Sequence, residues 1–320
     1  MPPLGSMTCS PHDCSFCGET SMQGPFSPRY LLALLTCTLL FAPTAPTQAA
    51  SPGDLQDHIL LLAVDQSVLA SNDKKLSERA HQLALRELTE EVANRMERRL
   101  MAAGIRSQAS ALPRGRVKLT ARTRKPRHWV EGIIAGGGAM EIRPDIDQTF
   151  IWSGLGGILP GDIELKETTR GTIAWSAERD PLAKFASKLT LAQGELYIVP
   201  DADGGWRTLL LGKAVLTHKD LASAKSAQSS IGLPFIQLTF GSSGAASWNA
   251  IPRATPMAMV LDGEVITTFQ TPNTRSQAQL SLQCSDIWVP ANKQDECVEV
   301  VVGRLAAPIP MKVTIMTGKE

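Results

Sequence analysis

The segment from Leu76 to Ala103 constrains the fold of this 320-residue chain most strongly. Gly104 follows it directly, and glycine commonly ends helices because it tolerates a positive φ. The apolar residues of the segment recur at spacings of three and four, which is typical of a helix that buries one face; they are Leu76, Ala80, Leu83, Ala84, Leu88, Val92, Met96 and Leu100. We therefore predict one long amphipathic helix, and its apolar side needs a sheet or a second helix to cover it.

Short strand-like segments flank this helix. Residues 58–65, HILLLAVD, are an apolar run typical of a buried strand, and residues 116–121, RVKLTA, alternate in polarity. A second helix is predicted at residues 128–135, before the glycine turn at residues 136–138. We expect residues 139–142, AMEI, to return to the same sheet. This β-α-β-α-β pattern predicts a small sheet with helices on one face.

The rest of the chain is predicted to be rich in strands. Asp262-Gly263 lies between two apolar runs and predicts a tight hairpin turn. Residues 241–251 predict a turn that leads into a short helix. Further strands are predicted at residues 172–175, 194–199, 207–211, 234–240 and 311–316.

The N-terminal part of the chain has the layout of an export signal. Arg29 precedes the apolar run Leu31–Ala42, and small residues follow up to Ala50. A basic start, an apolar middle too short to span a bilayer and a small-residue exit are typical of a signal peptide. We predict a signal at residues 22–50, with cleavage near Ala49 or Ala50. The alternative is a retained N-terminal anchor.

Residues 1–21 precede this signal and contain Cys9, Cys14 and Cys17. The spacing of these cysteines allows a metal site. The interpretation we favour is a spurious or disordered extension, with Met22 as the true start.

Two cysteines remain beyond the signal. Cys284 and Cys297 have twelve residues between them. In an exported chain such a pair favours a disulfide, which would stabilise the fold by about 3 kcal/mol in the chain-entropy model.

Composition and motifs exclude several function classes. The net charge of +1 and the 5% aromatic content do not suit a nucleic-acid binder, which needs basic excess and stacking residues. His58, His81, His128 and His218 are scattered, and neither a nucleophile elbow nor a phosphate-binding glycine motif is present. We therefore expect no catalytic residues, no cofactor and no metal site, and we expect that the protein is not an enzyme.

Two segments leave alternatives open. A run of cations without acids could contact an anionic surface or could protect an edge strand from pairing; it contains Arg114, Arg116, Lys118, Arg122, Arg124, Lys125 and Arg127. The apolar run from Phe150 to Pro160 could line a peptide groove, but core packing is the interpretation we favour.

Several segments resemble the first periplasmic domain of SecD, a subunit of the Sec translocon. The earlier ones are HILLLAVD, RMERRLMAAGIRSQASALPRGRVKLTA and GGGAMEIRP. The later ones are LLLGKAVLTHKDLASAK, PFIQLTFGSSGAASW, MAMVLDGEVITTFQT and VVGRLAAPIPMKVTIM. Their order agrees with that family between residues 58 and 316, but each is a structural signature rather than a catalytic motif. The stretch from Cys284 to Cys297 departs from the family and is interpreted as an added loop.

The resemblance implies an α+β fold with two parts. A ferredoxin-like α/β base would be formed by both chain ends, residues 53–145 and 309–316, and a mixed α+β head would be inserted at residues 146–308. It also implies a periplasmic, non-catalytic protein, peripheral to the inner membrane, that binds exported or unfolded polypeptide or a translocon protein. We expect no nucleic-acid partner and no transmembrane segment after signal removal. The alternative function is a structural subunit of an envelope complex unrelated to translocation.

Overall fold

The computed structural model describes residues 55–67, 69, 78–155, 159–273, 278–284, 293–309, 311 and 313–316. The predicted signal peptide and Cys9, Cys14 and Cys17 lie outside these residues. Residues 51–320 form one compact unit. Its fold is α+β, and its strands make antiparallel pairs in four sheets.

The base sheet joins the two ends of this unit. Its strands are β1 (Gln56–Val64), β2 (Arg106–Leu112), β3 (Arg116–Thr123) and β15 (Val313–Ile315), in the order β15-β1-β3-β2. In β1, Leu62 pairs with Ile315 on one side and with Val117 on the other. This antiparallel order is that of a ferredoxin-like unit, so the predicted fold class, with a ferredoxin-like base formed by both chain ends, is confirmed.

Two helices cover one face of the base sheet. The helix α2 (Glu78–Ala102) buries Val92, Met96 and Leu100, and α3 (Arg127–Ile134) buries Val130 and Ile133. Both sets pack on inward-facing strand residues such as Leu60 and Leu119 to form one core. The predicted helices are therefore confirmed, although the predicted start of the first at Leu76 lies outside the described residues.

The prediction that the strand after the glycine turn returns to the base sheet is wrong. The segment β4 (Met140–Pro144) pairs with β12 (Pro256–Leu261) and β9 (Leu216–Thr217) rather than with the base strands. Met140 and Ile142 are buried in a second core, and the positive φ values of Gly136 and Gly138 redirect the chain toward it. A side chain at Gly138 would approach the Arg304 carbonyl oxygen to 2.4 Å, so glycine is required there.

Two further sheets share this second core. The central sheet has the order β13-β12-β4-β9, and the hairpin sheet has the order β10-β11-β14. Asp262 and Gly263 form the predicted tight turn, both with positive φ. The core includes Trp248 of α6 (Ser242–Ala250), the short helix predicted there. The strands are β9 (Leu216–Thr217), β10 (Leu221–Gln228), β11 (Pro234–Phe240), β12 (Pro256–Leu261), β13 (Glu264–Gln270) and β14 (Gln279–Leu282), with a 3-10 turn η1 (His218–Asp220).

A fourth sheet, the lobe sheet, has the order β5-β6-β8-β7 and its own core. Its helices are α4 (Thr149–Gly154) and α5 (Arg179–Ala186). Ile151 and Trp152 are buried in this core, whereas Phe150 is exposed, so the apolar run is mainly core where it is described. The strands are β5 (Glu164–Thr168), β6 (Gly171–Ser176), β7 (Glu195–Pro200) and β8 (Trp206–Leu211).

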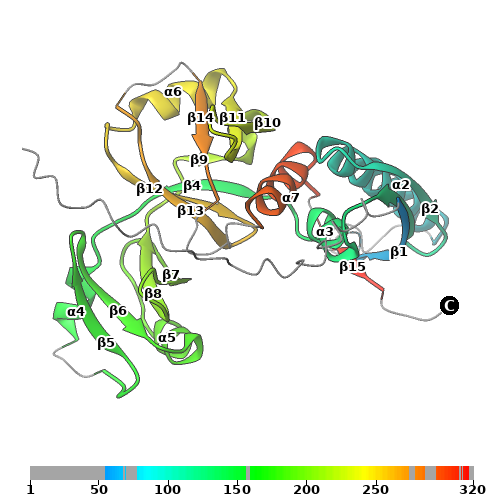
Figure 1. Ribbon diagram of the computed structural model, residues 1–320. Coiled ribbons are helices and arrows are strands. Elements are labelled where there is room, and N and C mark those ends of the chain that lie inside the picture. The colour runs from blue at the N-terminus through cyan, green and yellow to red at the C-terminus, as the bar shows by residue number, and fades with distance from the viewer. Residues whose placement is uncertain are drawn as a thin grey trace, which may run out of the picture. The chain divides into compact units, whose positions relative to one another are not determined.

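The helix α7 (Gln294–Ala306) contributes to two cores. Val298, Val301 and Leu305 are buried with the central and hairpin sheets. Val300, on another side of the helix, packs against the base core. Figure 1 shows α7 between the helices of the base and the strands β10 and β11. This helix is not among the elements predicted from the sequence.

Candidate functional site

The histidines lie on separate elements. His58 Nε2 is 2.9 Å from the Lys125 carbonyl oxygen, and His128 Nε2 is 3.3 Å from a Glu296 carboxylate oxygen. Burial, with a smaller contribution from Arg99, lowers the pKa of His218 and favours its neutral form. In the part of the chain that the structure describes, no group of three or more His, Cys, Asp or Glu side chains is arranged to hold a metal ion.

An ion cluster fixes the start of β7. Arg143 Nε is 2.6 Å from Glu141 and its Nη1 is 3.0 Å from Glu195, which opens β7. The Tyr197 hydroxyl donates a hydrogen bond to Glu195 over 3.1 Å. Burial raises the pKa of Tyr197 to about 12, so the hydroxyl stays protonated and remains a donor. The cluster connects β4 of the central sheet to β7 of the lobe sheet.

A groove of about 900 Å³ runs along β7, between α5 and the turn that joins β12 to β13. β7 is an edge strand of the lobe sheet, and Figure 1 shows α5 close to the β7–β8 hairpin. A helix beside an exposed strand edge is an arrangement that can receive an extended peptide. The walls expose both polar and apolar surface, and their apolar side chains include Leu189, Leu191, Leu196, Ile198, Trp206 and Val265.

The backbone of β7 offers hydrogen-bonding groups to this groove. The Asp201 N–H donates to the Gly205 carbonyl oxygen over 3.0 Å and closes the β7–β8 hairpin. Because bonded and non-bonded pairs alternate in an antiparallel ladder, Leu196 and Ile198 direct their N–H and C=O groups away from β8. Pro200 occupies the next position in this series, where no N–H is needed for the ladder.

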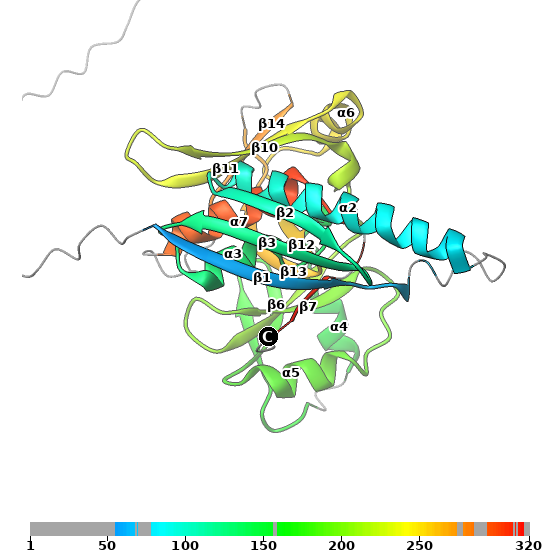
Figure 2. The same ribbon diagram turned by 90° about the vertical axis from the view of Figure 1, so that its right-hand side faces the viewer.

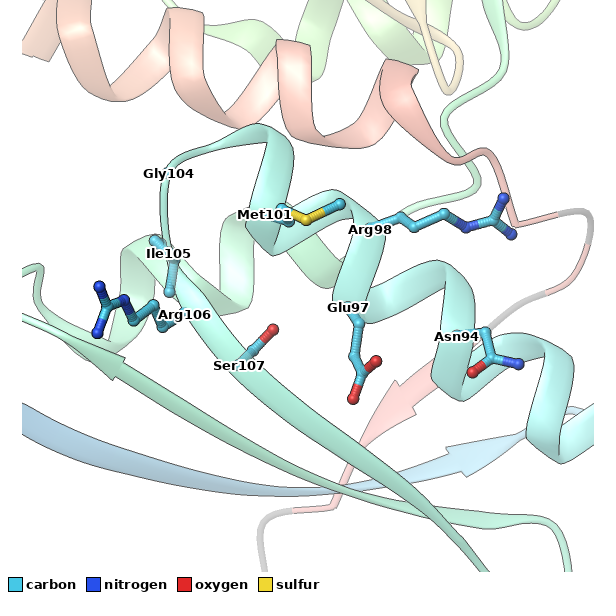
Figure 3. Close-up of a pocket in the computed structure, with 8 residues that line it drawn as sticks. All are labelled: Asn94, Glu97, Arg98, Met101, Gly104, Ile105, Arg106 and Ser107. Atoms are coloured by element: carbon cyan, nitrogen blue, oxygen red, sulfur yellow. The ribbon is translucent and has the colours of Figure 1, made fainter.

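A second groove, of about 640 Å³, lies between α2 and β2. It differs from the groove along β7 because a side chain occupies the edge of its strand, β2. Figure 3 shows Glu97 extending from α2 toward β2 near Ser107. The Glu97 carboxylate accepts a hydrogen bond from the backbone N–H of Ala109. A charged side chain that occupies a strand edge prevents pairing with a further strand. This groove is therefore a poorer site for an extended chain than the groove along β7.

The run of cations from Arg114 to Arg127 divides into separate groups. β3 lies between β1 and β2, so the interpretation that these cations protect an edge strand is wrong. Lys125 Nζ is 3.0 Å from Glu299 and 3.6 Å from the centre of the Trp129 ring. Arg127 Nε is 2.7 Å from Glu131. The last two cations are thus occupied by acids of α3 and α7.

The other cations of β3 share one face of the base sheet, which we call the open face. It is the face opposite α2 and α3, and Figure 2 shows its strands β1, β3 and β2 side by side. Cross-strand partners on this face follow from the register; they are Asp57, Arg122 and Arg106 in one row, Ile59, Thr120 and Gln108 in the next, then Leu61, Lys118 and Ser110, and then Ala63, Arg116 and Leu112.

The predicted disulfide between Cys284 and Cys297 is present, with the two Cα atoms 6.4 Å apart. Cys284 follows β14 and Cys297 lies in the first turns of α7. The bond therefore ties the hairpin sheet to the helix that also contacts the base. Residues 285–292 of the predicted loop lie outside the described residues.

The groove along β7 is not among the sites predicted from the sequence. One available signal was the apolar segment from Leu196 to Val199, which ends at Pro200. A proline at the end of an apolar strand is typical of an edge strand. The wall contributed by α5 could not have been foreseen, because that helix had not been predicted.

Comparisons with known proteins give a likeness of fold. No protein-family model matches the chain, and no curated protein matches its sequence. A crystal structure of SecDF in a super-membrane-facing form is 16% identical, with a TM-score of 0.43, over 85% of this chain and 32% of that one. This chain thus spans about a third of that protein.

Two further structures give similar values. A structure of SecDF, described as a membrane component that enhances protein export, is 15% identical, with a TM-score of 0.43, over 82% of this chain and 100% of that one. SecDF from Thermus thermophilus is 16% identical, with a TM-score of 0.28, over 82% of this chain and 31% of that one. At these scores the likeness carries no statement about activity or partners.

Proposed function

We propose that this protein is a non-catalytic periplasmic protein that binds extended segments of exported or unfolded polypeptide in the groove along β7. The observation that carries the proposal is that β7 pairs with β8 on one side only and lines a groove with its other edge, with the backbone groups of Leu196 and Ile198 directed away from β8. Backbone pairing at such an edge does not depend on the sequence of the bound chain, which suits a protein with many partners.

The walls of the groove would add a preference for apolar residues. In an extended peptide, side chains alternate between two sides. One side would face Leu196, Ile198 and Trp206, and the other would face Val265 and the turn that joins β12 to β13. The chain loses entropy when it becomes ordered, so we expect weak and reversible binding. Such binding suits a polypeptide that must be released.

The location also forms part of the proposal. The apolar run Leu31–Ala42 and the small residues after it support export, and the Cys284–Cys297 disulfide suits an oxidising compartment. No helix in the described ranges is long and apolar enough to cross a membrane.

The first test uses a labelled substrate protein that is kept unfolded by reduction and carboxymethylation. Fluorescence anisotropy measures how tightly this unfolded chain binds to the wild-type protein, in comparison with the native form of the same substrate. Ala183→Arg places a long side chain into the groove from α5 without altering β7. We expect it to weaken binding of the unfolded chain roughly tenfold or more, a loss of about 1.4 kcal/mol. Ala246→Arg on the exposed side of α6 is the matched control and should leave binding unchanged.

A second test addresses the backbone directly. A peptide of alternating valine and serine is compared with the same peptide N-methylated on the edge that would face β7. N-methylation removes hydrogen-bond donors while the side chains stay the same, so it should abolish binding. Equal binding of both peptides, or of Ala183→Arg and the wild-type protein, would exclude the groove. Purification of a folded envelope complex without unfolded-chain binding would instead favour a structural subunit.

A further inference from the structure

The open face carries more cations than its own acids can neutralise. Arg106 and Arg122 are direct cross-strand partners, an arrangement that is unfavourable for two like charges. Among the cross-strand partners on the open face, the acidic residue is Asp57. Its carboxylate lies 3.9 Å from Arg122, and both side chains are well exposed. Arg116 and Lys118 add two further cations. Such a face is suited to an external anionic partner.

Aliphatic side chains lie between these cations. Ile59 is 57% exposed although it lies in the middle of β1, and Met316 is 40% exposed. The Met316 N–H donates to the Leu61 carbonyl oxygen, which places it next to the row of Leu61 and Lys118. The face is therefore amphipathic, with a cationic column along β3 beside an aliphatic column along β1.

This composition favours one class of anion over others. The rows of β1, β3 and β2 contain no aromatic residue on the open face, so the stacking contacts of a nucleic-acid-binding sheet are absent there. An acidic protein would be matched by the cations but would leave no reason for an exposed isoleucine among them. An anionic membrane provides phosphate groups for Arg and Lys and an apolar layer beneath them for aliphatic side chains.

We propose that the open face docks on a membrane surface that contains anionic phospholipids. Arg106, Arg116, Lys118 and Arg122 would contact the headgroup phosphates, and Ile59 and Met316 would enter the boundary with the acyl chains. The surface is separate from the groove along β7, so this inference does not depend on the proposed function. Membrane electrostatics of this kind weaken with salt because the attraction falls off within a Debye length.

The test is co-sedimentation of the purified protein with vesicles of phosphatidylcholine, with or without phosphatidylglycerol. The variant K118Q/R122Q removes two cations from the open face. R79Q/R86Q removes two cations from the exposed side of α2 and leaves the same net charge. We expect the first variant to partition onto anionic vesicles at least about tenfold more weakly, while the second binds like the wild-type protein.

Two further measurements identify the source of the negative charge. Ile59→Thr keeps a β-branched residue in the strand but should reduce binding to anionic vesicles. Equal losses in the two double variants, or unchanged binding in K118Q/R122Q, would overturn the proposal. If Ile59→Thr bound anionic vesicles as tightly as the wild-type protein and polyglutamate displaced it from them, the open face would suit an acidic protein. That result would also overturn the membrane proposal. Ala183→Arg should sediment normally, which keeps this test independent of the groove.

Discussion

Arg99 lies where the chain passes twice between the base and the central sheet. Its side chain is fully buried, and its guanidinium donates to the carbonyl oxygens of Gly136 at 3.0 Å, Gly137 at 2.8 Å and Ala307 at 2.8 Å. Burial lowers the pKa of Arg99 to about 10, so it remains charged at neutral pH. The Arg99 guanidinium thus holds the segment at Gly136 and Gly137 and the segment at Ala307 through hydrogen bonds to their carbonyl oxygens. Hydrogen bonds of this kind are stronger when the donor is charged.

Replacement of Arg99 should be costly. Arg99→Met leaves several buried carbonyl oxygens without their donor, and we expect the free energy of unfolding to fall by about 3–5 kcal/mol. Arg98→Met, at the exposed neighbouring position, should change it by less than about 0.5 kcal/mol. Urea unfolding followed by circular dichroism measures both. Similar values for the two variants would contradict the role given to Arg99.

At the scale of elements, α7 packs closely on α3 at Gly303. A Cβ atom at this position would lie 2.8 Å from Ile133 Cγ2 and 3.1 Å from the Arg99 carbonyl oxygen. Gly303→Ala should therefore lower the free energy of unfolding by about 1–3 kcal/mol through overpacking. Gly154→Ala is the matched control, because that helical glycine has open space around it and should be neutral or slightly stabilising. Thermal unfolding of the pair distinguishes close packing from a general intolerance of alanine.

The disulfide is a second connection to α7. C284A/C297A should lower the free energy of unfolding by about 3 kcal/mol, with an added cost because Cys284 is buried. A reductant should destabilise the wild-type protein and leave the double variant unchanged. If reductant affected both proteins equally, its action would lie outside this bond.

Elements with a clear local pattern were predictable, and those decided by distant contacts were not. The helix α2 and the Asp262-Gly263 turn follow from spacing and turn chemistry alone. The spacing of Val298, Val301, Val302 and Leu305 also suits a helix, so α7 carried a local signal as well. The sheet that β4 joins depends on the path set by Gly136 and Gly138, which no local pattern encodes. The groove along β7 combines three such distant segments and could not have been predicted from sequence.

At the scale of the whole molecule, α7 connects two cores. Val301 and Leu305 pack with the central and hairpin sheets, while Val300 packs with the base. The buried Arg99 and the Cys284–Cys297 disulfide strengthen the same junction. Parts that share core side chains in this way open together, because exposing one removes packing from the other.

We therefore expect the base and the central sheet to unfold in one transition. Native-state hydrogen exchange at increasing denaturant should give the same opening free energy for amides of α2 and of β12. The lobe sheet has a core of its own, but Val199, Leu209 and Leu211 also share a buried cluster with Ala258 and Val260 of β12, so its amides should open at the same free energy. Gly303→Val, which forces α7 away from α3, should separate the opening of α2 from that of β12. Separate transitions already present in the wild-type protein would show that α7 does not couple the two cores.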